Sequence, residues 1–442
     1  MRCEKMARVY KKNFQTRAIH EGYAPGPTSP SSSVPIQRTS SYVFTDTRHA
    51  SDLFALKADG HIYTRMSNPT TQSLEERLAS LEGDGSGAGA LALCSGTTAV
   101  FYSIINLAKQ GDHIVSSTDL YGGTATQFAG MLPDFGITAS FANPADPDNF
   151  SKAITKKTKA LFCEAIGNPT LSVPDFGALA EVAHENSIPL IIDSTFATPY
   201  LLLPFNYGTD IVVHSLSKWI GGHGTGIGGA VVDSGNFDWK QSGKHPQFTA
   251  PDDNYHGIRY AYDFGKANRL AYINRMRLGA LRNLGGCIAP DNSWIFLQGL
   301  ETLSLRMERH CENALKVAKF LESNDAVSWV RYPGLSSHPS HGNAKKYFKK
   351  GFGGVVAFGV KGKGAGGKFI ENLSLFSHLA NVGDAKSLAI HPASTTHSQL
   401  TAKQLAECGI SPDLVRLSIG LEDAEDIIAD LEQALKVAPA GT

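Results

Sequence analysis

Lys218 is the residue of this sequence best suited to covalent chemistry. It follows the apolar run Ile211-Val-Val-His214 and the hydroxyl residues Ser215 and Ser217, and it precedes Gly221-Gly222. An amine between an apolar strand and a glycine-rich turn is partly desolvated, which lowers its pKa and favours the neutral form that builds a Schiff base. A surface lysine that closes a strand is the alternative interpretation.

A second candidate is Asp193, at the carboxyl end of the apolar run 189–192. Ligands of open α/β sheets bind outside the carboxyl ends of the strands, so an acid at this point is placed for binding. A carboxylate favours a neighbouring cation by about 1–3 pKa units, and a protonated ring nitrogen of a cofactor is such a cation. A helix N-cap or a turn aspartate would explain this single position equally well.

Two further segments could hold a phosphate and a planar ring. Ser95-Gly96-Thr97 precedes a helical pattern at 100–108, and the backbone N–H groups of a helix N-terminus bind phosphate. Tyr121 comes after the strand-like run 114–117, where an aromatic side chain can stack on a ring. Taken singly, these residues are explained as well by a serine N-cap and a packed loop tyrosine.

The four segments together describe a pyridoxal 5'-phosphate site, because an amine, an acid, a stacking aromatic and a phosphate cradle follow one another along the chain. A formal GxGxxG match at 224–229 does not indicate a dinucleotide cofactor, since the β-rich residues 230–232 follow it where a helix is required. No histidine, cysteine and carboxylate cluster has the spacing of metal ligands, so we expect no metal.

Short β-rich runs alternate with amphipathic helical stretches such as 175–185 through the middle of the chain. This alternation predicts an α/β fold in which helices cover both faces of a mostly parallel sheet. The predicted strands are 114–117, 160–163, 189–193, 211–214 and 228–232.

The chain divides into three predicted parts. An N-terminal arm at 1–70 precedes a large cofactor-binding domain at 71–277, in which the aromatic and glycine-rich residues 234–275 form an insertion. Residues 278–442 form a smaller C-terminal α+β domain. Its predicted elements are a long helical pattern at 293–317 and strands at 355–359 and 414–418.

Composition excludes several classes of protein. The 442 residues exceed the roughly 250–300 at which single cores stop growing, so at least two substructures are expected. The 41 basic and 41 acidic residues leave no net charge to hold nucleic acid, and the longest uncharged stretch, 85–108, is too rich in Gly, Ser and Thr to span a membrane. The six cysteines form no CxxC pair, which predicts reduced thiols and a cytoplasmic protein. An acid-poor N-terminus at 2–17 leaves open an organelle transit peptide, or a start at Met6.

From about residue 14 to residue 435 the sequence resembles the Cys/Met-metabolism family of pyridoxal-phosphate enzymes, which implies a fold-type-I transferase. Within the family, the sequence most resembles enzymes that join sulfide to O-acetylhomoserine. This closer resemblance is carried by residues 218–225, 233–275 and 379–397. In the last stretch, Lys386 stands where cystathionine-forming and γ-cleaving relatives usually carry glutamate. The motifs that carry the resemblance are Tyr63-Thr-Arg65, Ser67-Asn-Pro-Thr70, Ser95-Gly-Thr-Thr-Ala, Tyr121-Gly-Gly-Thr, Asp193-Ser-Thr-Phe, His214-Ser-Leu-Ser-Lys218-Trp-Ile-Gly-Gly and Val415-Arg416-Leu-Ser.

The resemblance implies roles for the matching residues. Lys218 is expected to bind the cofactor and then move protons, and Arg416 to clamp the substrate α-carboxylate through a two-point ion pair. Asp193 is expected to pair with the ring nitrogen, and Tyr121 to stack on the ring and act as a nearby acid or base together with Tyr63. The other implied cofactor ligands are Gly96, Thr97, Thr195, Ser215, Ser217 and, from a neighbouring subunit, Tyr63 and Arg65. The other implied substrate ligands are Asn168, Asn381 and Ser387.

Three positions depart from the usual pattern of the family. Thr97 stands where many relatives have Met or Gln, and Ser194 replaces a common Asn. Neighbouring or backbone groups can carry both contacts. Ala165, where Thr is frequent, is expected to alter the substrate pocket.

The implied activity is a γ-replacement that converts O-acetyl-L-homoserine and sulfide to L-homocysteine and acetate, or gives methionine when methanethiol replaces sulfide. The crossing arm implies a homo-oligomer, and the resemblance a tetramer. Sister reactions stay open: use of O-succinylhomoserine or cysteine, γ-elimination of methionine, or γ-replacement by a carbon or amine nucleophile. Lys386 and the insertion argue against the use of O-succinylhomoserine or cysteine and against the γ-elimination of methionine. They do not argue against a carbon or amine nucleophile. A non-catalytic interaction protein is the remaining alternative, against which the coexistence of Lys218, Asp193 and Arg416 argues.

Overall fold

The structure is a computed structural model that describes residues 12–26, 29–362, 364–395 and 409–438. The segment on which a transit peptide or a start at Met6 depends lies mostly outside the described residues, and so do residues 396 and 397 of the stretch that resembles the sulfide-using enzymes. None of the described helices combines the length and apolar character that a bilayer crossing requires.

A seven-stranded sheet forms the centre of the larger part of the molecule, with strand order β1-β7-β6-β5-β4-β2-β3. The neighbours from β6 to β3 are parallel, whereas β7 is antiparallel to both β1 and β6. The predicted mostly parallel sheet is therefore confirmed. The strands are β1 (Gly89–Leu93), β2 (His113–Ser117), β3 (Thr138–Ala142), β4 (Thr158–Glu164), β5 (Leu190–Asp193), β6 (Ile211–Ser215) and β7 (Gly229–Asp233).

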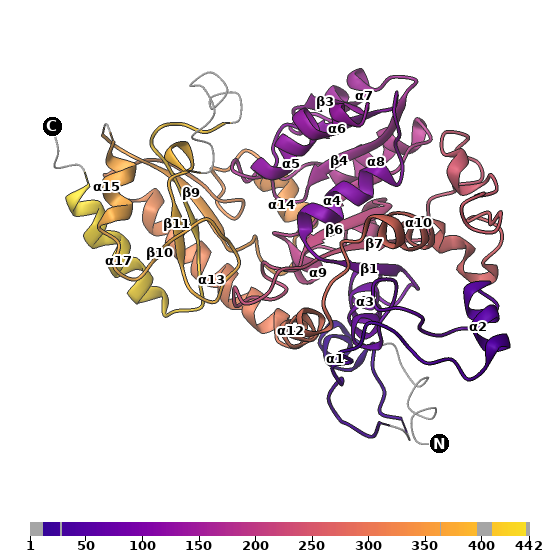
Figure 1. Cartoon of the computed structure of the whole chain (residues 1–442). Helices are drawn as coiled ribbons and strands as arrows, with labels where there is room; N and C mark the ends of the chain where they lie inside the picture. The colour runs from indigo at the N-terminus through magenta and orange to yellow at the C-terminus, as the bar shows by residue number, and fades with distance from the viewer. Residues whose placement is uncertain (1–11, 27–28, 363, 396–408, 439–442) are drawn as a thin grey trace.

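Helices cover both faces of this sheet (Figure 1). Alternate side chains of a strand point to opposite faces, so Val212 packs on one face and Val213 on the other. The Val212 face is covered by α3 (Pro69–Glu82), α8 (Phe176–Glu185) and α12 (Pro290–Glu301). The Val213 face is covered by α4 (Gly96–Ile105), η1 (Gln127–Met131), α6 (Leu132–Asp134) and α10 (Ala271–Met276).

The helix α3 shows how the sequence fixes these elements. Asn68 caps it by accepting hydrogen bonds from the backbone N–H groups of Thr70 and Thr71, and Pro69 occupies its first turn. Leu74 and Leu78, one turn apart, are fully buried against the sheet. This capped helix connects the N-terminal arm to the core of the large domain.

A second sheet of five strands forms the smaller part, in the order β10-β11-β12-β9-β8. Its apolar core is shared with α13, α15 and α17. The strands are β8 (Val327–Arg331), β9 (Val355–Val360), β10 (Ser377–His378), β11 (Leu388–Ile390) and β12 (Leu414–Ser418), and the helices are α13 (Leu303–Glu322), α15 (Ala365–Glu371) and α17 (Ala424–Val437). The helix α14 (His341–Tyr347) packs Ala344 and Tyr347 in the core of the first sheet.

Two predicted boundaries differ from the structure. The helical pattern at 293–317 is two helices, α12 and α13, because the chain leaves the helical conformation at Thr302. The boundary between residues 277 and 278 falls inside a helical segment that continues from α10 through η5 (Arg277–Leu281) to α11 (Arg282–Leu284). Since α12 packs in the core of the first sheet, this core extends beyond residue 278.

The insertion at 234–275 is packed into the core. Trp239 and Phe248 are buried, and the Trp239 ring stacks on Tyr272 with 5.8 Å between centroids. The N-terminal arm runs along the opposite end of the molecule from the second sheet (Figure 1). The remaining short helices are α1 (Phe14–His20), α2 (Thr47–Phe54), α5 (Gly122–Thr126), α7 (Asp148–Ala153), α9 (Thr198–Leu201), η2 (Pro204–Tyr207), η3 (Pro246–Phe248), η4 (Gly265–Leu270) and η6 (Pro392–Ser394).

Candidate active site

The carboxyl ends of five strands meet at one edge of the large sheet. Strands β2, β4, β5 and β6 are parallel, and β1 runs in the same direction because both β1 and β6 are antiparallel to β7. Ser95, Tyr121, Asp193 and Lys218 follow β1, β2, β5 and β6. The structure therefore brings the four segments that carry the predicted chemistry to the same edge.

Lys218 is joined to the second sheet through Asn381. Its Nζ donates a hydrogen bond to Asn381 Oδ1 at 2.5 Å, and Arg416 Nη2 lies 3.4 Å from the backbone oxygen of Asn381. Burial and, to a smaller extent, the charge of Arg416 together lower the pKa of Lys218 to about 8. The amine thus changes its protonation near neutral pH, which suits a group that must first bind covalently and then exchange protons.

Arg416 lies in β12 and reaches toward Asn168, a buried residue of the first sheet's domain. Its Nη1 donates to Asn168 Oδ1 at 3.3 Å, while its Nε is buried with no hydrogen-bond partner in the part of the chain that the structure describes. Burial lowers the pKa of Arg416 to about 10, so the guanidinium stays charged at neutral pH. A charged guanidinium with an unsatisfied N–H is suited to a carboxylate ligand.

Thr195 ties the ends of β5 and β6 together at Asp193. The Thr195 N–H donates to Asp193 Oδ1 at 2.9 Å, and the Thr195 hydroxyl oxygen accepts from the Ser215 N–H at 2.8 Å. Burial raises the pKa of Asp193, while its hydrogen bonds with Thr195 act in the opposite direction. A buried carboxylate held at this edge fits a cationic ring nitrogen.

The N-terminus of α4 lies against the end of β6. Ser95 caps the helix by accepting from the Thr98 N–H at 3.0 Å. A Cβ on Gly96 would lie 2.6 Å from the Cβ of Ser215, so only glycine allows this close approach. Backbone N–H groups and a serine hydroxyl gathered in this way fit a phosphate.

Two other predicted phosphate ligands stand at the same place. Thr97 is exposed in the first turn of α4. The Ser217 hydroxyl accepts from the Gly228 N–H at 3.0 Å and lies 3.3 Å from the Gly228 oxygen. Ser217 therefore fastens the turn after β6 to the start of β7, and its phosphate contact stays a prediction.

Tyr121 begins α5 with an exposed ring. A Cβ on Gly123 would lie 2.5 Å from the Tyr121 ring, so the ring folds closely over Gly123. The Tyr121 N–H donates to Glu164 Oε1 at 2.5 Å. Glu164 is a site residue that was not predicted, although it directly follows the predicted strand 160–163 and the rule that selected Asp193 applies to it.

Tyr63 and Arg65 lie on the arm, apart from this group. Both side chains are exposed, and the Arg65 guanidinium lies 5.2 Å from the Tyr63 ring centroid. In the described part of the chain, no hydrogen bond or ion pair joins them to the other predicted site residues. The structure of one chain does not bring these two residues to Lys218.

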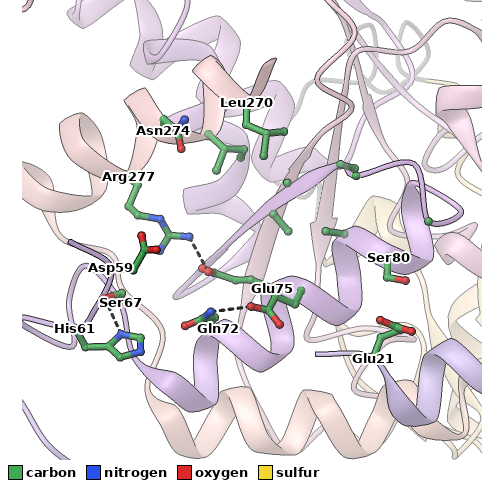
Figure 2. Close-up of a pocket in the computed structure, with 18 of the residues that line it drawn as sticks. Glu21, Asp59, His61, Ser67, Gln72, Glu75, Ser80, Leu270, Asn274 and Arg277 are labelled. Carbon is green, nitrogen blue, oxygen red and sulfur yellow. Dashed lines mark hydrogen bonds and ion pairs between the residues drawn. The ribbon is translucent and has the colours of Figure 1, made fainter. Parts of the chain in front are cut away.

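Arg277 anchors the arm to the body of its own chain. Its Nη1 donates to the Met66 oxygen at 2.8 Å, and its Nη2 forms an ion pair with Glu75 Oε2 at 2.6 Å. Figure 2 shows this ion pair inside a cavity of about 770 Å³ between the arm, α3 and α10. None of the predicted site residues lines this cavity, so it is separate from the edge that carries Lys218.

Ser387 is fully buried, and its hydroxyl is already engaged. The hydroxyl donates to Glu422 Oε2 at 2.9 Å and accepts from the Gly420 N–H at 2.9 Å. Its predicted contact with substrate stays a prediction. Among the described residues, no group of three or more His, Cys, Asp or Glu side chains could hold a metal ion.

Comparison with known proteins gives concordant matches over the length of the chain. A family model described as "Cys/Met metabolism PLP-dependent enzyme" matches residues 15–436. The chain is 50% identical over 440 residues to an O-acetyl-L-homoserine sulfhydrylase of Leptospira meyeri, with 98% of each chain covered. It is 49% identical over 444 residues to a homocysteine/cysteine synthase of Saccharomyces cerevisiae, with 97% of this chain and 99% of that protein covered.

A solved structure is similar over nearly the whole chain. It is a putative O-acetylhomoserine (thiol)-lyase of Campylobacter jejuni that contains a pyridoxyl-lysine monophosphate. The TM-score is 0.92 at 42% sequence identity, and the match covers 96% of this chain and 100% of that chain.

Proposed function

Since this chain belongs to the Cys/Met-metabolism family of PLP-dependent enzymes, we propose that it converts O-acetyl-L-homoserine and sulfide to L-homocysteine and acetate. The observation that carries the proposal is the contact of Lys218 with Asn381 beside Arg416, which places a titratable amine next to a guanidinium suited to an amino-acid carboxylate. The names of relatives at about half identity support the choice of substrate and nucleophile.

Each residue of the site has a proposed role in this reaction. Bound pyridoxal phosphate supplies an aldehyde for the substrate amine and an electron sink for the bonds broken beside it. Arg416 and Asn168 hold the α-carboxylate of the substrate. Lys218 would take the proton from the substrate Cα, give it up, and then take one from Cβ so that acetate leaves from Cγ. After sulfide adds at Cγ, Lys218 would return protons to Cβ and Cα of the product. Asn381 accepts a hydrogen bond from the Lys218 amine and so holds it beside the substrate.

The other residues orient the cofactor and shield it from water. Asp193 pairs with the ring nitrogen, and the Tyr121 ring covers one face of the cofactor ring and provides an acid or base near the reacting carbons. The phosphate is held at the start of α4 by Gly96 and Thr97. The further phosphate ligands that we propose are Ser215 and Ser217, and Thr195 is a further cofactor-binding residue.

We further propose that Tyr63 and Arg65 complete the phosphate site of a neighbouring subunit, with Tyr63 as a second acid or base. Their exposed position on an anchored arm, apart from the Lys218 site of their own chain, supports this arrangement. The enzyme is then a homo-oligomer, at least a dimer and by resemblance a tetramer. The free cysteines of the described chain accord with the cytoplasm as its compartment.

The test is product analysis by mass spectrometry. The purified protein with added cofactor is given O-acetyl-L-homoserine and, in parallel, sulfide, methanethiol or cysteine. We expect homocysteine from sulfide and little cystathionine from cysteine. The Lys218→Ala variant is the control, and it should lose both the product and the absorbance of the covalently bound cofactor. Consumption of O-acetyl-L-homoserine without a thiol product would overturn the choice of nucleophile.

A further inference from the structure

Glu164 is a second buried carboxylate at the edge of the sheet that carries the site. It is the last residue of β4 and is paired in register with Asp193 of β5. Ala160 and Phe162 pack on the face covered by α4, so by the two-residue period of a strand Glu164 points to that face as well. Asp193, two residues after Ile191, points to the same face. The two carboxylates are therefore neighbours on one face.

The contacts of Glu164 join two loops of the site. Its Oε1 accepts a hydrogen bond from the Tyr121 N–H at 2.5 Å, in the loop that follows β2. The backbone N–H of Asn168, in the loop that follows β4, also interacts with this carboxyl group and lowers its pKa. One side chain thus holds the residue proposed to cover the ring and the residue beside Arg416.

The surroundings of Glu164 make its ionised carboxyl group costly in free energy. Only 6% of the residue is exposed, and burial raises its pKa well above the ordinary value. The neighbouring charge of Asp193 raises the pKa further, whereas the two backbone hydrogen bonds lower it. A fold does not gain stability from two adjacent buried acids, so the hydrogen bonds to the two loops are what the second acid contributes.

We propose that Glu164 is a positioning residue, which fixes Tyr121 and Asn168 relative to Asp193 by accepting both of their backbone N–H groups. The inference rests on the proposed function, because it assigns Tyr121 to the cofactor ring and Asn168 to the substrate carboxylate. Glu164 acts through these two residues and does not itself contact the reacting atoms.

The test compares Glu164→Ala and Glu164→Gln with a matched control, Cys163→Ala. Cys163 is buried in the same strand, and its side chain packs on the opposite face. The measurements are the Kd for pyridoxal phosphate, kcat and KM for the amino-acid substrate, and Tm.

For Glu164→Ala, which removes the acceptor of these two N–H groups, we expect the cofactor Kd and the substrate KM to rise about tenfold or more. Glu164→Gln keeps one acceptor oxygen for two donors, so both values should rise about threefold, between those of the parent and the alanine variant. Cys163→Ala should lower Tm and leave Kd and KM at the parent values.

Two outcomes would overturn the inference. In the first, both Glu164 variants keep the parent values of Kd and KM. In the second, Cys163→Ala raises Kd and KM as much as the Glu164 variants do, which would show that the effect comes from destabilisation of β4. If Glu164→Ala does not fold, Glu164→Gln carries the test alone. The cofactor Kd is measured without substrate. A parent protein that forms no homocysteine would therefore refute the proposed function, and the role of Glu164 in holding Tyr121 would still be decided by the cofactor Kd.

Discussion

At the scale of single residues, the site depends on two cations, Lys218 and Arg416, placed on either side of Asn381. Both are partly buried, and Asn381 offers its side-chain oxygen to Lys218 and its backbone oxygen to Arg416. Burial and the charge of Arg416 both favour the neutral amine, which gives Lys218 a pKa of about 8. The guanidinium that we propose for the substrate carboxylate therefore also lowers the pKa of the amine that we propose to react.

This arrangement predicts how the apo-protein captures its cofactor. Only the neutral amine reacts with the aldehyde, so the rate of capture should rise as the pH is raised through about 8 and level off above it. In Arg416→Ala, one of the two causes of the lowered pKa is removed, and the midpoint should move to higher pH. Stopped-flow absorbance of the apo-protein mixed with pyridoxal phosphate measures both profiles.

The cofactor's own ionisations are the same for parent and variant, so the shift in midpoint isolates the effect of Arg416. Arg282→Ala is the control, because its guanidinium lies over the Tyr255 ring. A midpoint that is unchanged or lower in Arg416→Ala would contradict the proposed influence of Arg416 on Lys218.

Local patterns in the sequence identified the site residues at strand ends. They did not identify the site residues that are distant in sequence and close only in the folded chain. Asp193 and Lys218 follow apolar β-rich runs, so the rule that ligands bind at strand ends is enough to select them. The contact between Lys218 and Asn381 joins positions 163 residues apart, and no periodicity encodes it. Only the resemblance to a known family placed Asn381 and Arg416 among the candidates.

At the scale of secondary-structure elements, the missing predictions have physical causes. The strand β1 reads Gly-Ala-Leu-Ala-Leu, without the β-branched residues that mark a strand, and it is strand-like only because β7 pairs with it. The edge strand β3 is partly polar and equally hard to recognise. The break at Thr302 lies inside an unbroken helical pattern. The helix α12 packs in the core of the first sheet, whereas α13 begins in that core with Leu303 and Met307 and continues into the core of the second sheet with Ala314 and Val317.

The end of β7 gives a prediction for the stability of the element. Asp233 is almost fully buried, its Oδ1 accepts from the Gly235 N–H at 2.8 Å, and its Oδ2 has no hydrogen-bond partner among the described residues. Burial raises its pKa from 3.8 to about 7. The folded state therefore holds its proton more tightly than the unfolded chain, and this residue's contribution to stability falls as the pH rises from about 4 to 7.

In Asp233→Asn the ionisation is removed, so this loss should not occur. The Tm of the variant relative to the parent should increase between pH 4 and pH 8, corresponding to up to about 4 kcal/mol of unfolding free energy. Thermal unfolding of both proteins across this pH range measures the difference. Parallel Tm profiles would show that the Asp233 carboxyl is not perturbed in the folded protein.

At the scale of the whole molecule, the proposed site is divided between two sheets, and the arm carries two further proposed ligands, Tyr63 and Arg65, apart from both. Lys218 and Asp193 come from the first sheet and Arg416 from the second, so the site depends on how α12 and α13 join the two. The arm is fixed by Asn68 and Arg277 to its own body, yet it presents Tyr63 and Arg65 outward. A rigidly held arm with exposed functional residues is suited to completing the site of a second copy.

Complementation between two inactive chains tests this division. Lys218→Ala removes the amine of its own site, and Arg65→Ala removes a phosphate ligand that we assign to the site of the neighbour. In a mixed dimer, the chain with intact Lys218 receives the intact arm of the other chain, so one of its two sites is complete. Random assembly after co-expression should therefore restore about a quarter of the parent activity, more than the two variants show alone.

The control for this experiment pairs Lys218→Ala with Asp193→Ala. Both residues belong to the site of their own chain, so neither site of the mixed dimer is complete and no activity should return. Differently tagged chains allow the mixed oligomers to be purified before the assay. If purified mixtures of Lys218→Ala and Arg65→Ala are no more active than this control pair, Arg65 does not act across the subunit interface. The arm would then contribute ligands to the site of its own chain or to no site. The exposure of Tyr63 and Arg65 would then need an explanation other than the site of a neighbouring subunit.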